Sequence, residues 1–283
     1  MMPSTQRVDL NGLAALRLHG PRGASALITE HGAHLVSWIP AGGAERLYLS
    51  ERSAFRGGAA IRGGVPVIFP QFSTLGSGRR HGFARVLPWT PRGSPAAEGA
   101  ATAAFALRES PETLAEWPHP FELVLTVSLG ARELALELEV RNSGERPFAF
   151  AAALHTYLAV ADIAAARLHG LCGAAFRDQT DGGRADRDCG ESLAVNREID
   201  RIYAAPAAAL TLSEAGRRLR IAAENFTEVV VWNPWEEKCA LLTDMPPRGF
   251  EKMICVEAAL IGAPVALQPG TRWRGRQTLV ETA

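Results

Sequence analysis

Two ionisable side chains interrupt strongly apolar runs of this chain. His155 directly follows the run Phe148–Leu154, and Glu257 closes the run that starts at Met253. An imidazole or a carboxylate is costly to bury unless it is paired or does chemistry. An acid and a base of these two types could move protons to and from a bound substrate. Each could equally emerge into solvent at the end of a strand, and spacing alone does not bring together two residues 102 positions apart.

A second region combines glycine, proline and arginine. It reads IRGGVPVIFPQF over residues 61–72 and RRHGFAR over residues 79–85. Glycine lets a ligand approach the backbone closely, and arginine offers a fork of donors to an anion. The region could therefore bind a phosphate or sugar hydroxyls, or it could be a basic loop beside a buried strand.

The elements that must position these residues are mostly strands. Apolar and charged residues alternate over Arg132–Val140, and Gly130 joins this segment to Phe121–Leu129, which predicts a hairpin with one wet face. Only Ser110–Trp117 has a helical pattern. Further strands are expected at Ala24–Thr29, His34–Ile39, Val65–Phe69, Ala101–Leu107, Phe148–Leu154, Arg218–Ala222, Glu228–Trp232, Met253–Glu257 and Gln277–Val280.

Many short strands separated by glycine and proline favour an all-β, mainly antiparallel sandwich with few short helices. No linker or fixed-period repeat divides the 283 residues, so one domain over residues 1–283 is expected. The polar stretch Asp178–Asp188 is predicted to be a surface loop, because its aspartates are spaced too irregularly for a calcium loop.

Charge and composition exclude several partners. The chain has 30 basic and 30 acidic residues, so nothing favours nucleic acid or an anionic membrane. It has no uninterrupted apolar run of membrane-spanning length and no signal-peptide pattern at its start. Its four scattered cysteines are expected to be reduced thiols, which together predicts a cytoplasmic protein. The histidines show no metal-ligand spacing, and no metal site is expected.

Six segments in order resemble the hexose-6-phosphate mutarotases (glucose-6-phosphate 1-epimerases) of the aldose 1-epimerase superfamily. The resemblance runs from about Gly32 to the last strand and implies a galactose-mutarotase-like β-supersandwich. The segments are IRGGVPVIFPQF, HGFAR, LHTYLAVADI around His155, EIDRIY around Asp200, VVVWNP at Val229–Pro234, and CVE at Cys255–Glu257.

The resemblance also implies residue roles. His155 matches the general acid and Glu257 the general base of anomer interconversion, which needs neither metal nor organic cofactor. Positions that line the sugar site are matched by Arg62, His81, Arg85 and Asp200. Arg80 falls at a substrate-contacting position that is often not arginine in relatives, and together with Arg62 and Arg85 it could bind a 6-phosphate.

The expected function is therefore interconversion of the α and β anomers of a hexose 6-phosphate, with glucose 6-phosphate as the favoured substrate. One alternative is an aldose 1-epimerase acting on free galactose or glucose. Another is a catalytically silent carbohydrate-binding module. The expected partner is a small sugar phosphate, and the chain is expected to be a monomer or a weak oligomer.

Overall fold

Three antiparallel sheets build the protein. The computed structural model describes residues 3–93, 99–204, 206 and 208–282. Within these residues the N-terminal sheet contains, in spatial order, β1 (Ser4–Leu10), β2 (Leu13–His19), β3 (Ser25–Thr29) and β4 (Leu35–Ile39).

The two larger sheets are named here after their central long strands. The β9 sheet contains, in spatial order, β15 (Ser192–Leu193), β12 (Arg167–His169), β17 (Leu210–Glu214), β18 (Arg217–Glu224), β21 (Arg272–Thr282), β9 (Glu133–Asn142), β8 (Phe121–Leu129), β7 (Ala101–Arg108) and β6 (Thr90–Pro91). The β20 sheet contains β14 (Arg184–Arg187), β13 (Ala175–Asp178), β16 (Ile199–Ala204), β19 (Glu228–Asn233), β20 (Met253–Leu267), β10 (Phe148–Leu154) and β5 (Val67–Ile68), and β11 (Tyr157–Ala159) also pairs with β20.

Helices are few and short in the described residues. The α-helices are α1 (Pro111–Glu116) and α2 (Trp235–Leu241). Single 3₁₀ turns are η1 (Pro21–Gly23), η2 (Ala84–Val86), η3 (Gln179–Asp181) and η4 (Gly249–Lys252). None of the helices described is long and apolar enough to cross a membrane.

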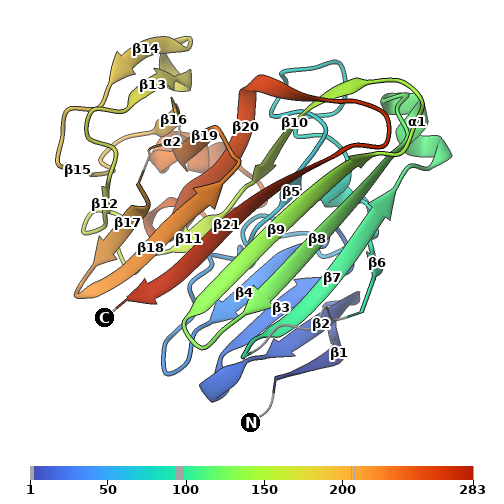
Figure 1. Ribbon diagram of the computed structural model, residues 1–283. Coiled ribbons are helices and arrows are strands. Elements are labelled where there is room, and N and C mark those ends of the chain that lie inside the picture. Colours follow the sequence, from blue (N-terminus) through green and yellow to red (C-terminus); the bar gives the residue numbers. More distant parts are fainter. Residues whose placement is uncertain (1–2, 94–98, 205, 207, 283) are drawn as a thin grey trace.

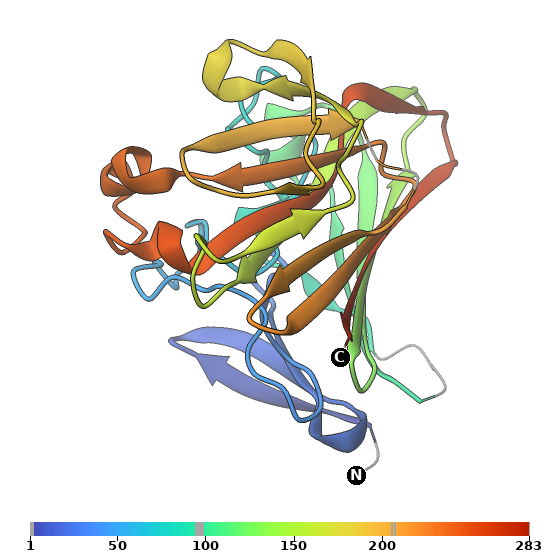
Figure 2. The ribbon, with the colours of Figure 1, turned by 90° about the vertical axis from the view of Figure 1, so that its left-hand side faces the viewer.

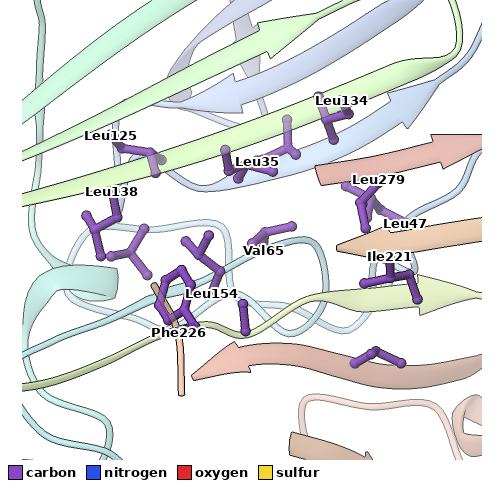
Figure 3. Packing of buried hydrophobic residues seen from close by; sticks show 14 of the residues in the cluster. Leu35, Leu47, Val65, Leu125, Leu134, Leu138, Leu154, Ile221, Phe226 and Leu279 are labelled. Atoms are coloured by element: carbon purple, nitrogen blue, oxygen red, sulfur yellow. The ribbon is translucent and has the colours of Figure 1, made fainter. Parts of the chain in front are cut away.

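The β9 sheet and the β20 sheet form the two main layers (Figure 1). A view turned by 90° shows the N-terminal sheet at one end of these layers (Figure 2). Buried leucines and isoleucines from both layers meet between them, for example Leu138 of β9, Leu154 of β10, Ile221 of β18 and Leu279 of β21 (Figure 3). This apolar interior holds the two layers face to face.

The central strands of the β20 sheet are buried on both faces where β10 pairs with residues 258–260 of β20. Leu154 and Val256 belong to the interior between the layers, while Ala153 and Ala259 belong to a second apolar cluster on the opposite face. A strand with two buried faces reads as a continuous apolar run and does not alternate. This explains the unbroken sequences of β10 and β20, from which the two ionisable residues stand out.

The glycine-rich segment joins the sheets through close backbone contacts. Gly63 forms an isolated bridge with Leu49 and has a φ of 114°. A Cβ there would lie 2.3 Å from the carbonyl oxygen of Tyr48, and one on Gly64 would lie 2.2 Å from that of Leu35. Only glycine permits this approach, which fixes the neighbouring Arg62.

Several sequence predictions are confirmed. The hairpin of β8 and β9 is present, and α1 begins at the expected position with a capping box formed by Ser110 and Thr113. The four cysteines are free thiols. Helix α2 was not predicted, because seven residues are too few to show a helical period.

Two predictions about local structure are wrong. Most of residues 178–188 lie at the surface as predicted, but they form the hairpin of β13 and β14 and not a loop. Asp178 pairs with Arg201, and Asp188 accepts a hydrogen bond from Tyr203. The strand expected to end at Glu257 continues to Leu267: residues 258–261 are also buried, and residues 265–267 pair with the start of β10. Glu257 therefore lies inside the strand.

Candidate active site

Strand register brings His155 and Glu257 together. His155 directly follows β10, where Leu154 pairs with Ala258 of β20. The next residue back along β20 is Glu257, so the same register places His155 opposite it. Cross-strand partners in an antiparallel pair point to the same face. His155 Nδ1 lies 3.3 Å from Glu257 Oε1. One strand pairing thus brings together two residues that are 102 positions apart in the sequence.

The same row continues across the sheet. Val230 of β19 pairs with Glu257 on one side and with Ile202 of β16 on the other. Ile202 and Val230 belong to the apolar cluster on the face away from the β9 sheet. The polar pair therefore lies at the end of an apolar row, which keeps bulk water from its sides.

A neighbouring row supplies more functional groups. Asp200 of β16 pairs with Trp232 of β19, Trp232 pairs with Cys255 of β20, and Cys255 pairs with Tyr157 of β11. Asp200 and Trp232 line the same pocket as His155. The floor of this pocket is formed by residues from both rows: His155, Ile202, Val230 and Glu257 from the first, and Asp200 and Trp232 from the second.

Loops complete the pocket walls. Six of the seven predicted site residues line it: Arg62, Arg80, His81, His155, Asp200 and Glu257. The remaining lining residues are Phe72, Ser73, Thr74, Leu75, Gln179, Ile202, Val230 and Trp232.

The His155–Glu257 pair is deeply buried and incompletely bonded. The two side chains are 9% and 1% exposed. His155 Nδ1 and Glu257 Oε2 have no hydrogen-bond partner. Burial raises the pKa of Glu257 well above its usual value, and the nearby Asp200 carboxylate adds to this effect. Burial lowers the pKa of His155 well below its usual value, with smaller contributions from the positive charges of Arg62 and Arg85.

His81 is held as a neutral donor. Its ring Nδ1 accepts a hydrogen bond from the backbone N–H of Ser73 at 3.2 Å, and the backbone N–H of His81 donates to the Ser73 carbonyl at 2.9 Å. Burial lowers its pKa to about 3, with further lowering by Arg85 and Arg80. Because Nδ1 is an acceptor, this hydrogen bonding assigns the ring proton to Nε2. His81 therefore offers one N–H at the pocket wall.

Arg62 is anchored by two partners. Its Nε and Nη2 donate to the carboxylate of Asp244 at 3.1 to 3.2 Å, and its Nη1 donates to the hydroxyl of Tyr157 at 3.0 Å. The ring of Tyr157 stacks on that of His155, with centroids 4.7 Å apart and an interplanar angle of 5°. Arg62 and Tyr157 thus fix the plane of the His155 imidazole.

The other two arginines differ in position. Arg80 lines the pocket, is exposed, and its side chain makes no hydrogen bond or ion pair within the described part of the chain. Arg85 does not line the pocket. Its Nη2 donates to the Arg80 carbonyl at 3.0 Å, and burial lowers its pKa to about 10. Its buried Nε has no hydrogen-bond partner among the residues that the structure describes. Arg85 supports the Arg80 backbone.

The carboxyl of Asp200 has a raised pKa. Burial raises its pKa to about 6, and the nearby Glu198 also raises it, while Lys238 acts in the opposite direction. A carboxyl that titrates in this range can accept hydrogen bonds from sugar hydroxyls or donate one to them.

Sequence reasoning missed three residues that hold the site. Asp244 and Tyr157 anchor Arg62, and Trp232 lines the pocket. Tyr157 follows His155 by two positions, so a strand continuing past His155 would have placed both on one face. Asp244 gave no signal, because it lies in a loop 182 positions from Arg62.

This arrangement suits proton transfer on a polyol ligand. A buried acid–base pair, one fixed N–H donor, a carboxyl and an indole face surround one pocket on a β-sandwich. Indole and aliphatic walls accept the apolar faces of a sugar ring, and the polar groups accept its hydroxyls. The fold and site together define a carbohydrate-modifying enzyme.

Known proteins agree with this class. The family model described as aldose 1-epimerase matches residues 14–280. A relative from Cenchrus ciliaris, named "Putative glucose-6-phosphate 1-epimerase", is 35% identical and covers 95% of this chain and 85% of its own length. A relative of the same name from Salmonella typhimurium is 32% identical and covers 93% and 89%. The chain therefore belongs to the aldose 1-epimerase family.

A solved structure supports the same assignment. The crystal structure titled a "putative mutarotase" from Salmonella typhimurium superimposes with a TM-score of 0.90 at 31% identity, covering 98% of this chain and 93% of that one. The predicted family, the mainly antiparallel galactose-mutarotase-like fold and the isomerase class are confirmed.

Proposed function

We propose that this protein interconverts the α and β anomers of a hexose 6-phosphate, with glucose 6-phosphate as its substrate. The observation that carries the proposal is the His155–Glu257 pair, buried at the pocket floor with unpartnered proton-carrying atoms. Buried polar atoms are almost always satisfied within the protein, so these atoms are reserved for a ligand. The names of the two curated relatives support the substrate.

His155 and Glu257 share one proton, which can reside on either side chain. The pKa shifts of both groups favour a protonated Glu257 beside a neutral His155 in the empty pocket. Transfer of this proton to Nδ1, across 3.3 Å, gives a carboxylate base and an imidazolium acid without changing the total charge. We assign this transfer to the substrate-bound state, in which the sugar hydroxyls can stabilise the ionised pair.

Anomer exchange then follows in two balanced steps. The Glu257 carboxylate removes the proton of the C1 hydroxyl while the His155 imidazolium protonates the ring oxygen, and the C1–O5 bond breaks to give the open-chain aldehyde. After rotation about C1–C2, the same oxygen attacks the other face of C1. Glu257 returns its proton to the aldehyde oxygen, which becomes the C1 hydroxyl of the other anomer, and His155 takes back its proton from the attacking C5 hydroxyl. Each group contributes a factor of roughly 10²–10⁴ to the rate.

The other pocket groups hold the sugar. We assign the sugar hydroxyls to the N–H of His81, the carboxyl of Asp200 and the guanidinium of Arg62. All three residues line the pocket, and Asp244 holds Arg62 in place. Tyr157 acts as a positioning residue, because its ring stacks on His155 and does not line the pocket.

Arg80 is assigned to the 6-phosphate. Arg62 already pairs with Asp244, so its charge is largely compensated. Arg80 has no such partner, and an exposed guanidinium at a pocket rim can bind a phosphate with two parallel hydrogen bonds. Arg85 acts on the phosphate only through the Arg80 backbone that it supports. The four free thiols support a reducing compartment and hence the cytoplasm as the site of the reaction.

Two-dimensional exchange NMR between the anomers of glucose 6-phosphate tests the proposal, with free glucose and free galactose measured in parallel. The proposal predicts enzyme-dependent exchange that is much faster for the phosphorylated sugar. Exchange confined to free sugars would instead identify an aldose 1-epimerase. Binding of glucose 6-phosphate without faster exchange would identify a carbohydrate-binding module.

A further inference from the structure

A thiol lies beside the proposed catalytic pair. Cys255 precedes Glu257 by two positions in β20, so both side chains leave the same face of the strand. A ring nitrogen of His155, a carboxylate oxygen of Glu257 and Cys255 Sγ all lie within 4.8 Å of one another. Imidazole, thiolate and carboxylate are ligands that Zn²⁺ and Cd²⁺ accept together.

The donor atoms are buried and unsatisfied. The side chains of His155 and Glu257 are 9% and 1% exposed, and Cys255 is fully buried. His155 Nδ1 and Glu257 Oε2 have no hydrogen-bond partner. Two unpartnered polar atoms in one buried cluster are rare in native proteins, and a cation placed among the three residues would satisfy them.

We infer that His155, Cys255 and Glu257 form an inhibitory binding site for a soft divalent cation such as Zn²⁺. His155 and Glu257 also line the sugar pocket, so the fourth coordination position faces the pocket and is open to water. Zinc bonds to nitrogen, oxygen and sulfur ligands are roughly 2.0–2.3 Å long. The three side chains must therefore draw together by roughly an ångström.

The proton balance of binding is simple. The cation takes a lone pair from the neutral imidazole, the carboxylate of Glu257 and the thiolate of Cys255. The thiol and the carboxyl each release one proton to solvent, so two protons leave for each cation bound. No oxidant or reductant takes part.

Inhibition rests on the proposed function. A bound cation occupies the atoms of His155 and Glu257 that carry protons during anomer exchange, so the pair cannot act as acid and base. The sugar and the cation need the same end of the pocket, and Zn²⁺ should therefore compete with hexose 6-phosphate.

Cadmium binding tests the site without any activity measurement. The full chain carrying C172S and C189S, which removes both exposed thiols, is freed of metal with a chelator and titrated with Cd²⁺. We expect one equivalent to produce the ultraviolet absorbance of a cadmium–thiolate bond. C255S should abolish this band, while C239S should keep it, since Cys239 is equally buried but lies outside the three-residue cluster. A band that survives C255S would overturn the inference.

Zinc inhibition is then measured in the same proteins. Zn²⁺ should inhibit anomer exchange competitively, and C255S should raise its inhibition constant at least about tenfold. If C255S does not fold, C255A removes the sulfur without adding a hydroxyl. Unchanged inhibition in a folded Cys255 variant would contradict the inference. A cadmium band in a protein without mutarotase activity would keep the metal site and remove the proposed function.

Discussion

Buried polar side chains differ in their hydrogen bonding between the two faces of the β20 sheet, where β10 pairs with β20. On the pocket face, His155 and Glu257 keep polar atoms without partners. On the interior face, the next residue, Thr156, donates its hydroxyl to Gln277 Oε1 at 2.5 Å, and Gln277 Nε2 donates to the Val256 carbonyl at 3.1 Å. Burial is nearly complete on both faces.

The Thr156–Gln277 pair and the His155–Glu257 pair therefore have different roles. Thr156 and Gln277 join the two main sheets, and the fold gains from each of their hydrogen bonds. His155 and Glu257 lie close together, yet one polar atom of each side chain makes no hydrogen bond to the described residues. This lowers the stability of the fold and leaves the atoms available for a ligand. Substitutions on the two faces should therefore separate activity from stability.

The largest effect on turnover is expected for E257Q. The amide keeps the shape of the carboxyl but cannot take up the C1 proton, so the exchange rate should fall at least about a hundredfold. The free energy of unfolding should be no lower than in the wild type, because the variant removes a buried ionisable group. Exchange NMR and chemical denaturation measure the two quantities, and near-normal exchange would remove Glu257 from the mechanism.

A smaller effect is expected for R80A. Loss of a charge-assisted hydrogen bond of about 1.5–3 kcal/mol should raise KM for glucose 6-phosphate by about 10- to 100-fold and leave free glucose nearly unaffected. R79A is the matched control, since Arg79 pairs with Glu116 and Glu112 outside the pocket. Equal losses in the two variants would show that Arg80 does not bind the phosphate.

On the interior face, Q277L should change turnover by less than about threefold. It removes the Gln277 partner of both the Thr156 hydroxyl and the Val256 carbonyl, and we expect a loss of about 1–3 kcal/mol in the free energy of unfolding. Q268L, at an exposed glutamine, is the control and should be nearly neutral. A stable Q277L protein would show that the interior pair does not carry the stability assigned to it.

The smallest effect is a pH dependence of stability at Asp200. Burial raises its folded-state pKa from 3.8 to about 6, so the folded protein binds more protons than the unfolded chain between about pH 4 and 6. Stability associated with Asp200 is present at low pH and is lost as the pH rises through this window. We therefore expect the difference in free energy of unfolding between D200N and the wild type to favour D200N more strongly at pH 7 than at pH 4.

Asp178 is the control for Asp200, because its pKa is shifted in the opposite direction. Hydrogen bonds from Thr180 and Arg201 outweigh burial and lower the pKa of Asp178. Stability associated with Asp178 is present at neutral pH and is lost as the pH falls through its depressed pKa. D178N should thus be less stable than the wild type at pH 7, and equal pH trends in the two variants would contradict both assignments.

Much of the fold could be predicted from the sequence. Alternation identified β8 and β9, because each has one face turned to the interior. The start of β20 at Met253 was predicted, but its C-terminal end was not, since residues 253–261 are buried on both faces and carry no period that marks an end. The hairpin at residues 178–188 was missed because ion pairs and hydrogen bonds with β16 hold its polar side chains.

The site was predictable only in part. Apolar runs broken by one ionisable residue, together with the family resemblance, identified His155 and Glu257. Their contact depends on the pairing of β10 with β20, which no local pattern encodes. The pairing of Asp244 with Arg62 and the hydrogen bond from Arg85 to the Arg80 carbonyl depend on how loops pack. Neither could be inferred from residue type and spacing.

The double variant H155N/E257Q tests most directly whether the two residues act as one proton-sharing pair. Its anomer exchange rate on glucose 6-phosphate is compared with those of H155N and E257Q. If the pair acts as a unit, either single substitution removes nearly all of its contribution, and the double variant should be within about threefold of the slower single variant. Losses that multiply in the double variant would show two independent groups and contradict the account.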